Sequence, residues 1–335
     1  MYCVMKKSIW LFIVSLTVCM LSGCSVSNKS KDLVSETGFY FDTVIQISMV
    51  HEQSDDLLKE CFAMCEAFEQ IFSKTDPGSE LYMVNHRTSS QVEISEHLWK
   101  VIETGLEFGA YTQGAFDITI APLTDLWNFK EEPWTIPREE DLEAALKKVD
   151  YKKVHLEYQE EEDMVKRMVV FDDGDTMLDL GALAKGYAAD CLKEMLVNAG
   201  VESGCINLGG NVQTIGRKPD GSSWKIGIQK PFEGRGTVLP AVETIGQSVV
   251  SSGIYERHFE LDGKRYHHVL DPFTGYPLEA SLDQVTVVCE DSLMGDAVST
   301  SCLLLGEEKG KELLAKIGFS NVWLHLDDRC VMIKQ

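Results

Sequence analysis

The sequence predicts an α+β fold, with mixed, mainly antiparallel sheets and packed helices. Residues 204–288 contain a run of short strand patterns, without the regular β–α alternation of a doubly wound parallel sheet. Amphipathic helix patterns stand out at 54–72 and 184–199. The chain has 335 residues, of which 44% are hydrophobic and 25% charged. This length suits one large domain or two intertwined subdomains.

The first half of the chain begins with a strand pattern and continues mainly with helices. Residues 39–50 alternate apolar and polar, which predicts a half-buried strand with one face formed by Phe39, Phe41, Thr43, Ile45, Ile47 and Met49. Residues 54–72 form a helix that Ser54 or Asp55 can cap. The other elements expected here are a turn at 76–78 and helices at 95–111, around 126–127 and at 137–149.

The second half contains most of the expected strands. The helix from Ala184 to Ala199 has one apolar face, and Gly200 fits its end. Expected strands lie near 153–157, 167–171, 176–180, 204–208, 224–229, 237–242, 245–250, 257–261, 265–270 and 282–288. Helices at 293–305 and 309–317 precede two short final strands.

The N-terminus carries the pattern of an exported lipoprotein. Lys6 and Lys7 precede an apolar run at 8–20, which is short for a bilayer span. The run ends in Leu21-Ser22-Gly23-Cys24, which resembles a bacterial lipobox; an ordinary signal peptide with a chance cysteine is the alternative. We expect a signal peptide at 1–23, a lipidated Cys24 with a tether over 24–37, and a location on the extracytoplasmic face of the cell membrane.

Charge and cysteine content restrict the possible partners. The net charge of −22 argues against nucleic-acid binding, which needs a basic surface, and against docking on anionic lipid. Membrane contact is therefore assigned to the lipid anchor.

Cys3 and Cys19 leave with the signal and Cys24 is lipidated, so seven of the ten cysteines remain. This odd number, mostly in apolar runs, indicates buried small side chains rather than a disulfide framework.

The segment from Asp179 to Gly186 joins a strand end to a helix start. Gly181 and Ala182 keep bulk away from the turn, so a ligand can approach the backbone. Free N–H groups at the helix start favour a phosphate, and Lys185 would add positive charge. The alternative is a tight turn with an exposed lysine.

Asp296 and Thr300 stand four residues apart on an expected helix and so face the same way. A carboxylate and a hydroxyl, aided by a backbone carbonyl, form a hard oxygen site suited to Mg²⁺, which also shares substrate phosphates. The alternative is an N-cap aspartate followed by a threonine that bonds back to the helix. On this pair alone, that alternative is favoured.

Three more segments offer polar or aromatic contacts. His268 leads out of a strand into a turn and is a candidate contact near a leaving group, although a lone histidine is usually structural. Residues 251–257 form a small polar loop that can contact a ligand. Residues 115–117 place Phe116 beside Asp117, whose carboxylate can accept from a nucleobase or ribose. The alternative there is a buried phenylalanine with a turn aspartate.

Together and in this order, the motifs resemble the ApbE family, the FAD:protein FMN transferases. The resemblance covers about 39–333 and implies an ApbE-like flavin transferase domain over 38–335. The matching segments are F-D-T at 41–43, S-E-L-x-x-x-N at 79–85, G-A-F-D-I-T-I-A-P-L at 114–123, D-L-G-A-L-A-K-G-Y-A-A-D at 179–190, I-N-L-G-G-N at 206–211, S-S-G-I-Y-E-R at 251–257, H-V-L-D-P-x-T-G at 268–275 and D-A-V-S-T-S at 296–301.

The resemblance implies FAD as substrate and Mg²⁺ as cofactor. The FMN half of FAD would pass to a threonine hydroxyl of an acceptor flavoprotein, and AMP would leave. The implied metal ligands are the Ala182 carbonyl, Asp296 and Thr300. The implied flavin contacts are Phe41, Thr75, Ala115, Phe116, Asp117, Gly181, Lys185 and Leu270. The implied catalytic groups are Asp296, Lys185 and His268, with Asp296 as first candidate base and His268 as second.

Two positions depart from the family pattern, and two other functions stay open. Members often have Met-Gly-Thr at 41–43, and some carry Tyr at the position of Thr75.

The implied partners are exported acceptor flavoproteins, such as FMN-binding redox subunits with a D-x-x-[SAT]-x-T motif. One alternative is a hydrolase that cleaves FAD to FMN and AMP. The other is a non-catalytic, lipid-anchored flavin-binding or solute-binding protein, which would not need the metal pair.

Overall fold

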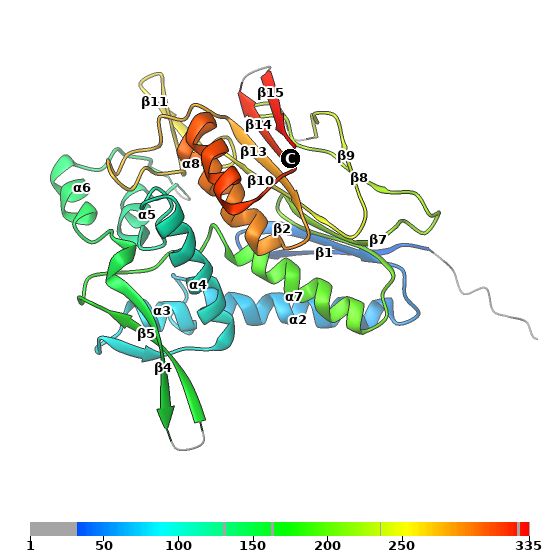
Figure 1. The fold of residues 1–335 in the computed structure, drawn as a ribbon, viewed down its shortest axis with the longest axis horizontal. Coiled ribbons are helices and arrows are strands. Elements are labelled where there is room, and N and C mark those ends of the chain that lie inside the picture. Colours follow the sequence, from blue (N-terminus) through cyan, green and yellow to red (C-terminus); the bar gives the residue numbers. More distant parts are fainter. Residues whose placement is uncertain (1–31, 130–131, 162–163, 235, 327–328, 335) are drawn as a thin grey trace, which may run out of the picture. The chain divides into compact units, whose positions relative to one another are not determined.

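A central antiparallel sheet of eight strands organises the computed structural model, which describes residues 32–129, 132–161, 164–234, 236–326 and 329–334 (Figure 1). Its strands, in spatial order, are β1 (Val34–Tyr40), β2 (Thr43–Met49), β6 (Ser203–Leu208), β7 (Asn211–Gly216), β10 (Ser248–Gly253), β13 (Gln284–Cys289), β14 (Val322–Leu326) and β15 (Arg329–Ile333). The expected predominance of antiparallel pairing is confirmed. The register places Ile45 opposite Leu208 and Ile47 opposite Ile206, and all four side chains are buried.

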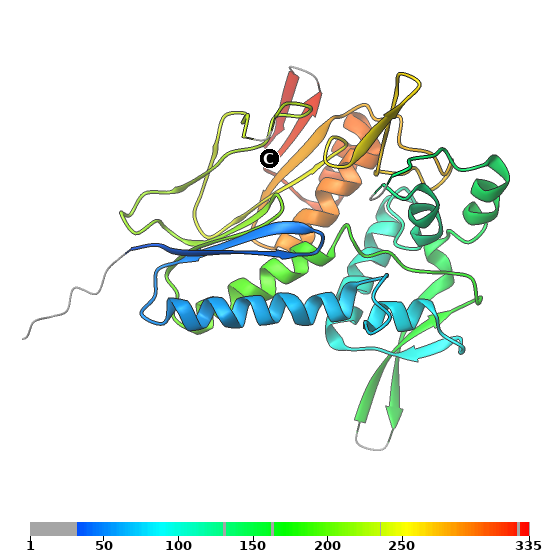
Figure 2. The ribbon, with the colours of Figure 1, turned by 180° about the vertical axis from the view of Figure 1, so that it is seen from behind.

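Three helices pack against the sheet. α2 (Ser54–Phe72) contacts β1, α7 (Ala184–Asn198) contacts β6 and β7, and α8 (Ser292–Ile317) contacts β10 and β13. The two views show α7 and α8 as neighbours on one face of the sheet, and α4 (Glu96–Tyr111) packs against α8 (Figures 1 and 2). α8 is kinked at Gly306, where φ is 73°. The helices expected at 293–305 and 309–317 are therefore two parts of one kinked element.

A second, smaller core lies beside the first. α5 (Ala121–Trp127), α6 (Glu139–Leu146) and the hairpin of β11 (His258–Leu261) and β12 (Lys264–His267) contribute Trp127, Leu142, Phe259 and Tyr266 to one hydrophobic cluster. Both cores belong to one compact unit that starts at Leu33. The other elements are α3 (Glu80–Asn85), η1 (Tyr151–Lys153), a sheet of β3 (Gln91–Glu93), β5 (Met164–Phe171) and β4 (Val154–Glu161), and the pair β8 (Trp224–Ile226) and β9 (Val242–Thr244).

The helices at 54–72 and from Ser95 are confirmed, and Ser95 Oγ accepts the Leu98 N–H at 3.1 Å. The strand expected at 39–50 is instead a hairpin, because the chain reverses at Phe41 and Asp42 with φ of 54° and 56°. Phe39 therefore does not share the buried face: its side chain is 68% exposed.

Other local expectations were wrong for identifiable reasons. The N-cap residue of α2 is Gln53, because Ser54 Oγ donates to the His51 carbonyl oxygen instead of capping the helix. Asp55 lies inside the first turn. Residues 176–180 form no strand, since the Asn85 side chain occupies the backbone groups at 178. Residues 237–241 form only an isolated bridge, because Pro240 has no N–H for a ladder.

The expected signal peptide at 1–23 and the lipidated Cys24 lie outside the described residues. The expected tether over 24–37 overlaps the sheet, since β1 begins at Val34. Among the residues that are described, no helix combines the length and apolar character needed to cross a bilayer. Their cysteines are all free; Cys61, Cys65 and Cys302 are buried as expected, whereas Cys330 is exposed.

Candidate active site

Asp296 is a buried carboxylate on one helix that is held by a second helix and by a strand of the central sheet. It lies on α8 with 6% of its surface exposed. Its Oδ2 accepts the Gly186 N–H of α7 at 2.6 Å, and its Oδ1 accepts from Asn211 Nδ2 of β7 at 3.2 Å. Burial raises the pKa of Asp296 to about 6, against the opposing effects of the Lys185 charge and these two hydrogen bonds. The fold therefore raises the pKa of a carboxylate at this position above its ordinary value.

Thr300 lies one turn after Asp296, and its Oγ1 is 3.0 Å from Ser252 Oγ of β10. Ser252 Oγ also lies 2.8 Å from Ser299 Oγ. The alternative of a helix cap is wrong, because the N-cap of α8 is Asp291, whose side chain accepts the Met294 N–H. Capping the start of α8 therefore does not explain the presence of Asp296.

The third expected metal ligand is the carbonyl oxygen of Ala182, just before α7. In a regular helix the Gly186 N–H would bond the Ala182 carbonyl, but here it donates to Asp296. No backbone donor to that carbonyl is present in the described part of the chain. One carboxylate, one hydroxyl and one carbonyl fit Mg²⁺, which binds few protein oxygens and retains water. Among the described residues no cluster of three His, Cys, Asp or Glu side chains forms a competing metal site.

The start of α8 is held by α7. Asp190 accepts the Ser292 and Leu293 N–H groups, one on each carboxylate oxygen and both at 2.8 Å. Burial and the neighbouring Asp291 carboxylate raise the pKa of Asp190. These bonds satisfy free N–H groups at the beginning of α8 and fix its position one turn before Asp296.

Lys185 and His268 provide the other charged and titratable groups. Lys185 is half-buried and makes no ion pair within the described residues, while its charge acts on both Asp296 and His268. The Nδ1 of His268 lies 3.2 Å from the Arg257 carbonyl oxygen. Because a carbonyl can only accept, Nδ1 carries the proton and Nε2 keeps its lone pair. Burial lowers the pKa of His268 to about 4, so the ring is neutral at pH 7.

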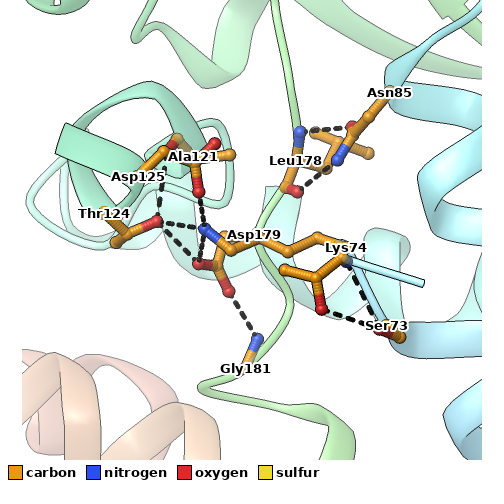
Figure 3. A network of polar contacts seen from close by, with 10 residues as sticks. Ser73, Lys74, Asn85, Ala121, Thr124, Asp125, Leu178, Asp179 and Gly181 are labelled. Carbon is orange, nitrogen blue, oxygen red and sulfur yellow. Dashed lines mark hydrogen bonds and ion pairs between the residues drawn. The ribbon is translucent and has the colours of Figure 1, made fainter. Parts of the chain in front are cut away.

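Three sequence motifs meet at residues 178–181 (Figure 3). Asn85 donates to the Leu178 carbonyl at 2.8 Å and accepts the Leu178 N–H at 2.7 Å. The Asp179 N–H donates to the Ile118 carbonyl at 2.8 Å, and Asp179 Oδ1 accepts the Gly181 N–H at 3.0 Å. The motifs at 79–85, 114–123 and 179–190 therefore form one structural unit despite their separation in sequence.

Comparisons with known proteins place the chain in a family. The ApbE family profile matches residues 41–323. The chain belongs to the ApbE family. It is 36% identical over 262 residues to a protein from Klebsiella pneumoniae (strain 342) named FAD:protein FMN transferase, covering 78% of this chain and 79% of that protein. A Treponema pallidum (strain Nichols) protein of the same name is 32% identical over 283 residues, covering 81% of this chain and 78% of that protein.

Solved structures of the family share the fold. The ApbE protein from Thermotoga maritima superposes with a TM-score of 0.79 at 28% identity, covering 91% of this chain and 97% of that chain. The flavinyl transferase ApbE from Pseudomonas stutzeri, in its apo form, gives a TM-score of 0.75 at 28% identity, covering 90% and 93%. The α+β prediction and the family resemblance are therefore confirmed, and the relatives named above are transferases.

Residues 115–117 of this ApbE-family chain are tightly packed. Phe116 is 3% exposed. Asp117 Oδ1 accepts from the N–H and hydroxyl of Thr119 at 2.7 and 2.6 Å, and Oδ2 accepts the Tyr151 N–H at 2.9 Å. The geometry matches the buried phenylalanine with a turn aspartate. The flavin contacts at Ala115, Phe116 and Asp117 stay predictions.

The other expected flavin contacts lie in different surroundings. Phe41 is in the β1–β2 turn, where its N–H donates to Glu69 Oε1 at 2.8 Å. Thr75 lies in the loop after α2, and Gly181 is exposed. Leu270 is 3% exposed within the second core, two residues after His268. Each contact stays a prediction.

Sequence reasoning missed the partners that hold the site. Asn211 binds Asp296, and its signal was the final N of I-N-L-G-G-N at 206–211. Asn85 is the final N of S-E-L-x-x-x-N at 79–85. Lys74 pairs with Asp179, and no motif marked it. Both asparagines belong to the family motifs, but their roles could not be predicted, because their partners are far away in the sequence.

Proposed function

We propose that this protein transfers the FMN moiety of FAD to a threonine hydroxyl of acceptor flavoproteins, with Mg²⁺ as cofactor and AMP as product. The observation that carries the proposal is the buried Asp296, held by Gly186 and Asn211 beside the Thr300 hydroxyl. Membership of the ApbE family and relatives named FAD:protein FMN transferase support the reaction.

The metal-binding residues would be Asp296, Thr300 and the Ala182 carbonyl. Bound Mg²⁺ would neutralise negative charge on the pyrophosphate. Lys185 lies close enough to influence the pKa of both Asp296 and His268, so its ammonium can hold a phosphate oxygen next to them. Phosphoryl transfer depends mainly on such positioning and charge stabilisation.

In the proposed step, the threonine oxygen forms a bond to the FMN phosphorus, and the bond from that phosphorus to the bridging oxygen breaks. The electron pair leaves with AMP, and the hydroxyl proton passes to a base. Asp296 stays the first candidate for this base, because burial raises its pKa to about 6, whereas burial lowers the pKa of His268 to about 4 and makes its neutral Nε2 the weaker base. Each oxygen of Asp296 accepts one hydrogen bond and keeps a further lone pair.

The decisive experiment incubates the purified protein with FAD, Mg²⁺ and a flavoprotein domain that carries an acceptor threonine. The intact mass of the acceptor should increase by one FMN residue, and AMP should appear in equal amount. Asp296→Asn should abolish both at saturating Mg²⁺; near-normal transfer would contradict the assigned role of Asp296. FMN free in solution with an unmodified acceptor would instead identify a hydrolase, and FAD binding without AMP would identify a flavin-binding protein.

We also propose that the protein is lipid-anchored through Cys24 on the extracytoplasmic face of the membrane and acts on exported acceptors. The lipobox-like segment at 21–24 supports this. Cells expressing Cys24→Ala should release the protein from the membrane fraction. Equal membrane association of the wild type and this variant would contradict the anchor.

A further inference from the structure

Lys74 makes a three-way polar contact beside the candidate site (Figure 3). Its Nζ lies 3.0 Å from Asp179 Oδ2 and 2.6 Å from Asp125 Oδ1, and it donates to Thr124 Oγ1 at 2.6 Å. Thr124 Oγ1 in turn donates to Asp179 Oδ2 at 2.8 Å. The Lys74 ammonium therefore connects three parts of the chain. These are the loop after α2, the helix α5 and the segment that precedes α7.

The contact with Asp179 is partly shielded from water. The Lys74 and Asp179 side chains are each 19% exposed, whereas the Asp125 side chain is 52% exposed. Burial alone would raise the pKa of Asp179, but the Lys74 charge and the Gly181 N–H together hold it below its usual value. Removing Lys74 would leave a shielded carboxylate without its counter-charge, which is costly.

Each end of this contact is next to an expected flavin contact. Thr75 follows Lys74 directly, and its N–H donates to Ser73 Oγ at 3.3 Å. On the other side, Asp179 holds the Gly181 N–H through its second oxygen. The ion pair thus links two loops that lie far apart in the sequence.

We propose that Lys74 is a positioning residue that sets the affinity for the flavin nucleotide by holding the segments at Thr75 and Gly181 together. This inference rests on the proposed function for the identity of the nucleotide. Lys74 acts through Asp179 and Thr124, so its loss should weaken FAD binding more than the chemical step.

The test compares Lys74→Met, which keeps the length of the side chain but removes its charge, with Lys74→Arg, which keeps the charge. Lys59→Met is the matched control, because Lys59 pairs with Asp56 on the exposed surface of α2. FAD dissociation constants come from quenching of flavin fluorescence, and KM and kcat come from AMP release. Hydrogen exchange of the ligand-free protein reports on residues 73–79 and 179–182.

We expect Lys74→Met to raise the FAD dissociation constant and KM by about tenfold or more, while kcat at saturating FAD changes less than threefold. Exchange should quicken at both segments, Lys74→Arg should recover most of the affinity, and Lys59→Met should match the wild type. Wild-type FAD affinity in a destabilised Lys74→Met protein would overturn the proposal, since the pair would then be only structural.

A second variant guards against failure to fold. Asp125→Asn removes the more exposed partner of Lys74 and should raise the FAD dissociation constant by a smaller factor than Lys74→Met. If Lys74→Met does not fold, Asp125→Asn decides the test. Wild-type FAD affinity together with wild-type hydrogen exchange in Asp125→Asn would then contradict the proposal. A wild-type protein that binds FAD but releases no AMP would refute the transferase function, while the binding and exchange results would still decide the role of Lys74.

Discussion

Gly186 is a point of close contact between α7 and α8, and a single methyl group should disrupt it. A Cβ at Gly186 would lie 2.5 Å from the Ser292 carbonyl oxygen, 2.8 Å from Asp296 Oδ2 and 2.8 Å from Leu293 Cα. Two of these atoms belong to the α8 backbone, which cannot rotate away as a flexible side chain can. Gly186→Ala must therefore separate the two helices and strain the hydrogen bond to Asp296.

The expected loss of stability follows from three contributions. Overpacking costs about 1–3 kcal/mol. Weakening a hydrogen bond to a charged carboxylate costs about 1.5–3 kcal/mol. Alanine favours a helix over glycine by about 1 kcal/mol, which offsets part of the cost. The net destabilisation is about 1.5–5 kcal/mol, or a fall of at least about 3 °C in the unfolding midpoint.

Thermal unfolding and AMP release test this prediction together. Gly174→Ala is the matched control, because no atom lies within 4 Å of a Cβ at that position. Gly186→Ala should unfold at lower temperature and lose most transfer activity, whereas Gly174→Ala should change neither. If the two variants share the wild-type midpoint, the close packing of α7 on α8 is not what requires glycine.

Three further outcomes are expected. Asp190, whose pKa is raised in the fold, retains a proton that the unfolded chain releases, so stability should fall as pH rises from about 4 toward neutrality. Asp190→Asn should reduce the difference between urea midpoints at pH 5 and pH 8; an unchanged difference would refute this. Asn85→Ala leaves both buried backbone groups of Leu178 unpaired and should cost about 2–4 kcal/mol by urea unfolding, and a loss below about 1 kcal/mol would argue against these bonds. Among the described cysteines, Cys330 should react first with iodoacetamide in peptide mass mapping, and equal labelling of the buried cysteines would contradict their burial.

The sequence predicted those features that depend on local pattern. The helix at 54–72 and the Ser95 cap follow from periodicity and from a side chain that bonds within its own turn. The β1–β2 hairpin was missed because its turn uses Phe41 and Asp42 at positive φ rather than glycine. Alternation continued through the turn residues, so the pattern resembled one strand.

The site itself was predicted only in part. Asp296 and Thr300 are four residues apart on one helix, so their shared direction could be read from the sequence. The atoms that hold Asp296 come from Gly186 and Asn211, 110 and 85 residues away in the chain. Lys74 was missed for the same reason, because nothing in its neighbourhood indicates a partner at Asp179.

The strand order has a consequence for the folding of each new chain. β2 ends at Met49, but its other neighbour in the sheet, β6, begins only at Ser203. Until β6 has been synthesised, Ile45 and Ile47 of the β1–β2 hairpin lack the strand that pairs with them. An isolated two-stranded hairpin is only marginally stable in water. Contacts of such long sequence separation form slowly, because the loop must close before it gains any stabilisation. The surroundings of Asp296 are thus completed late in folding, and fragments that end before α8 should expose apolar strands and aggregate.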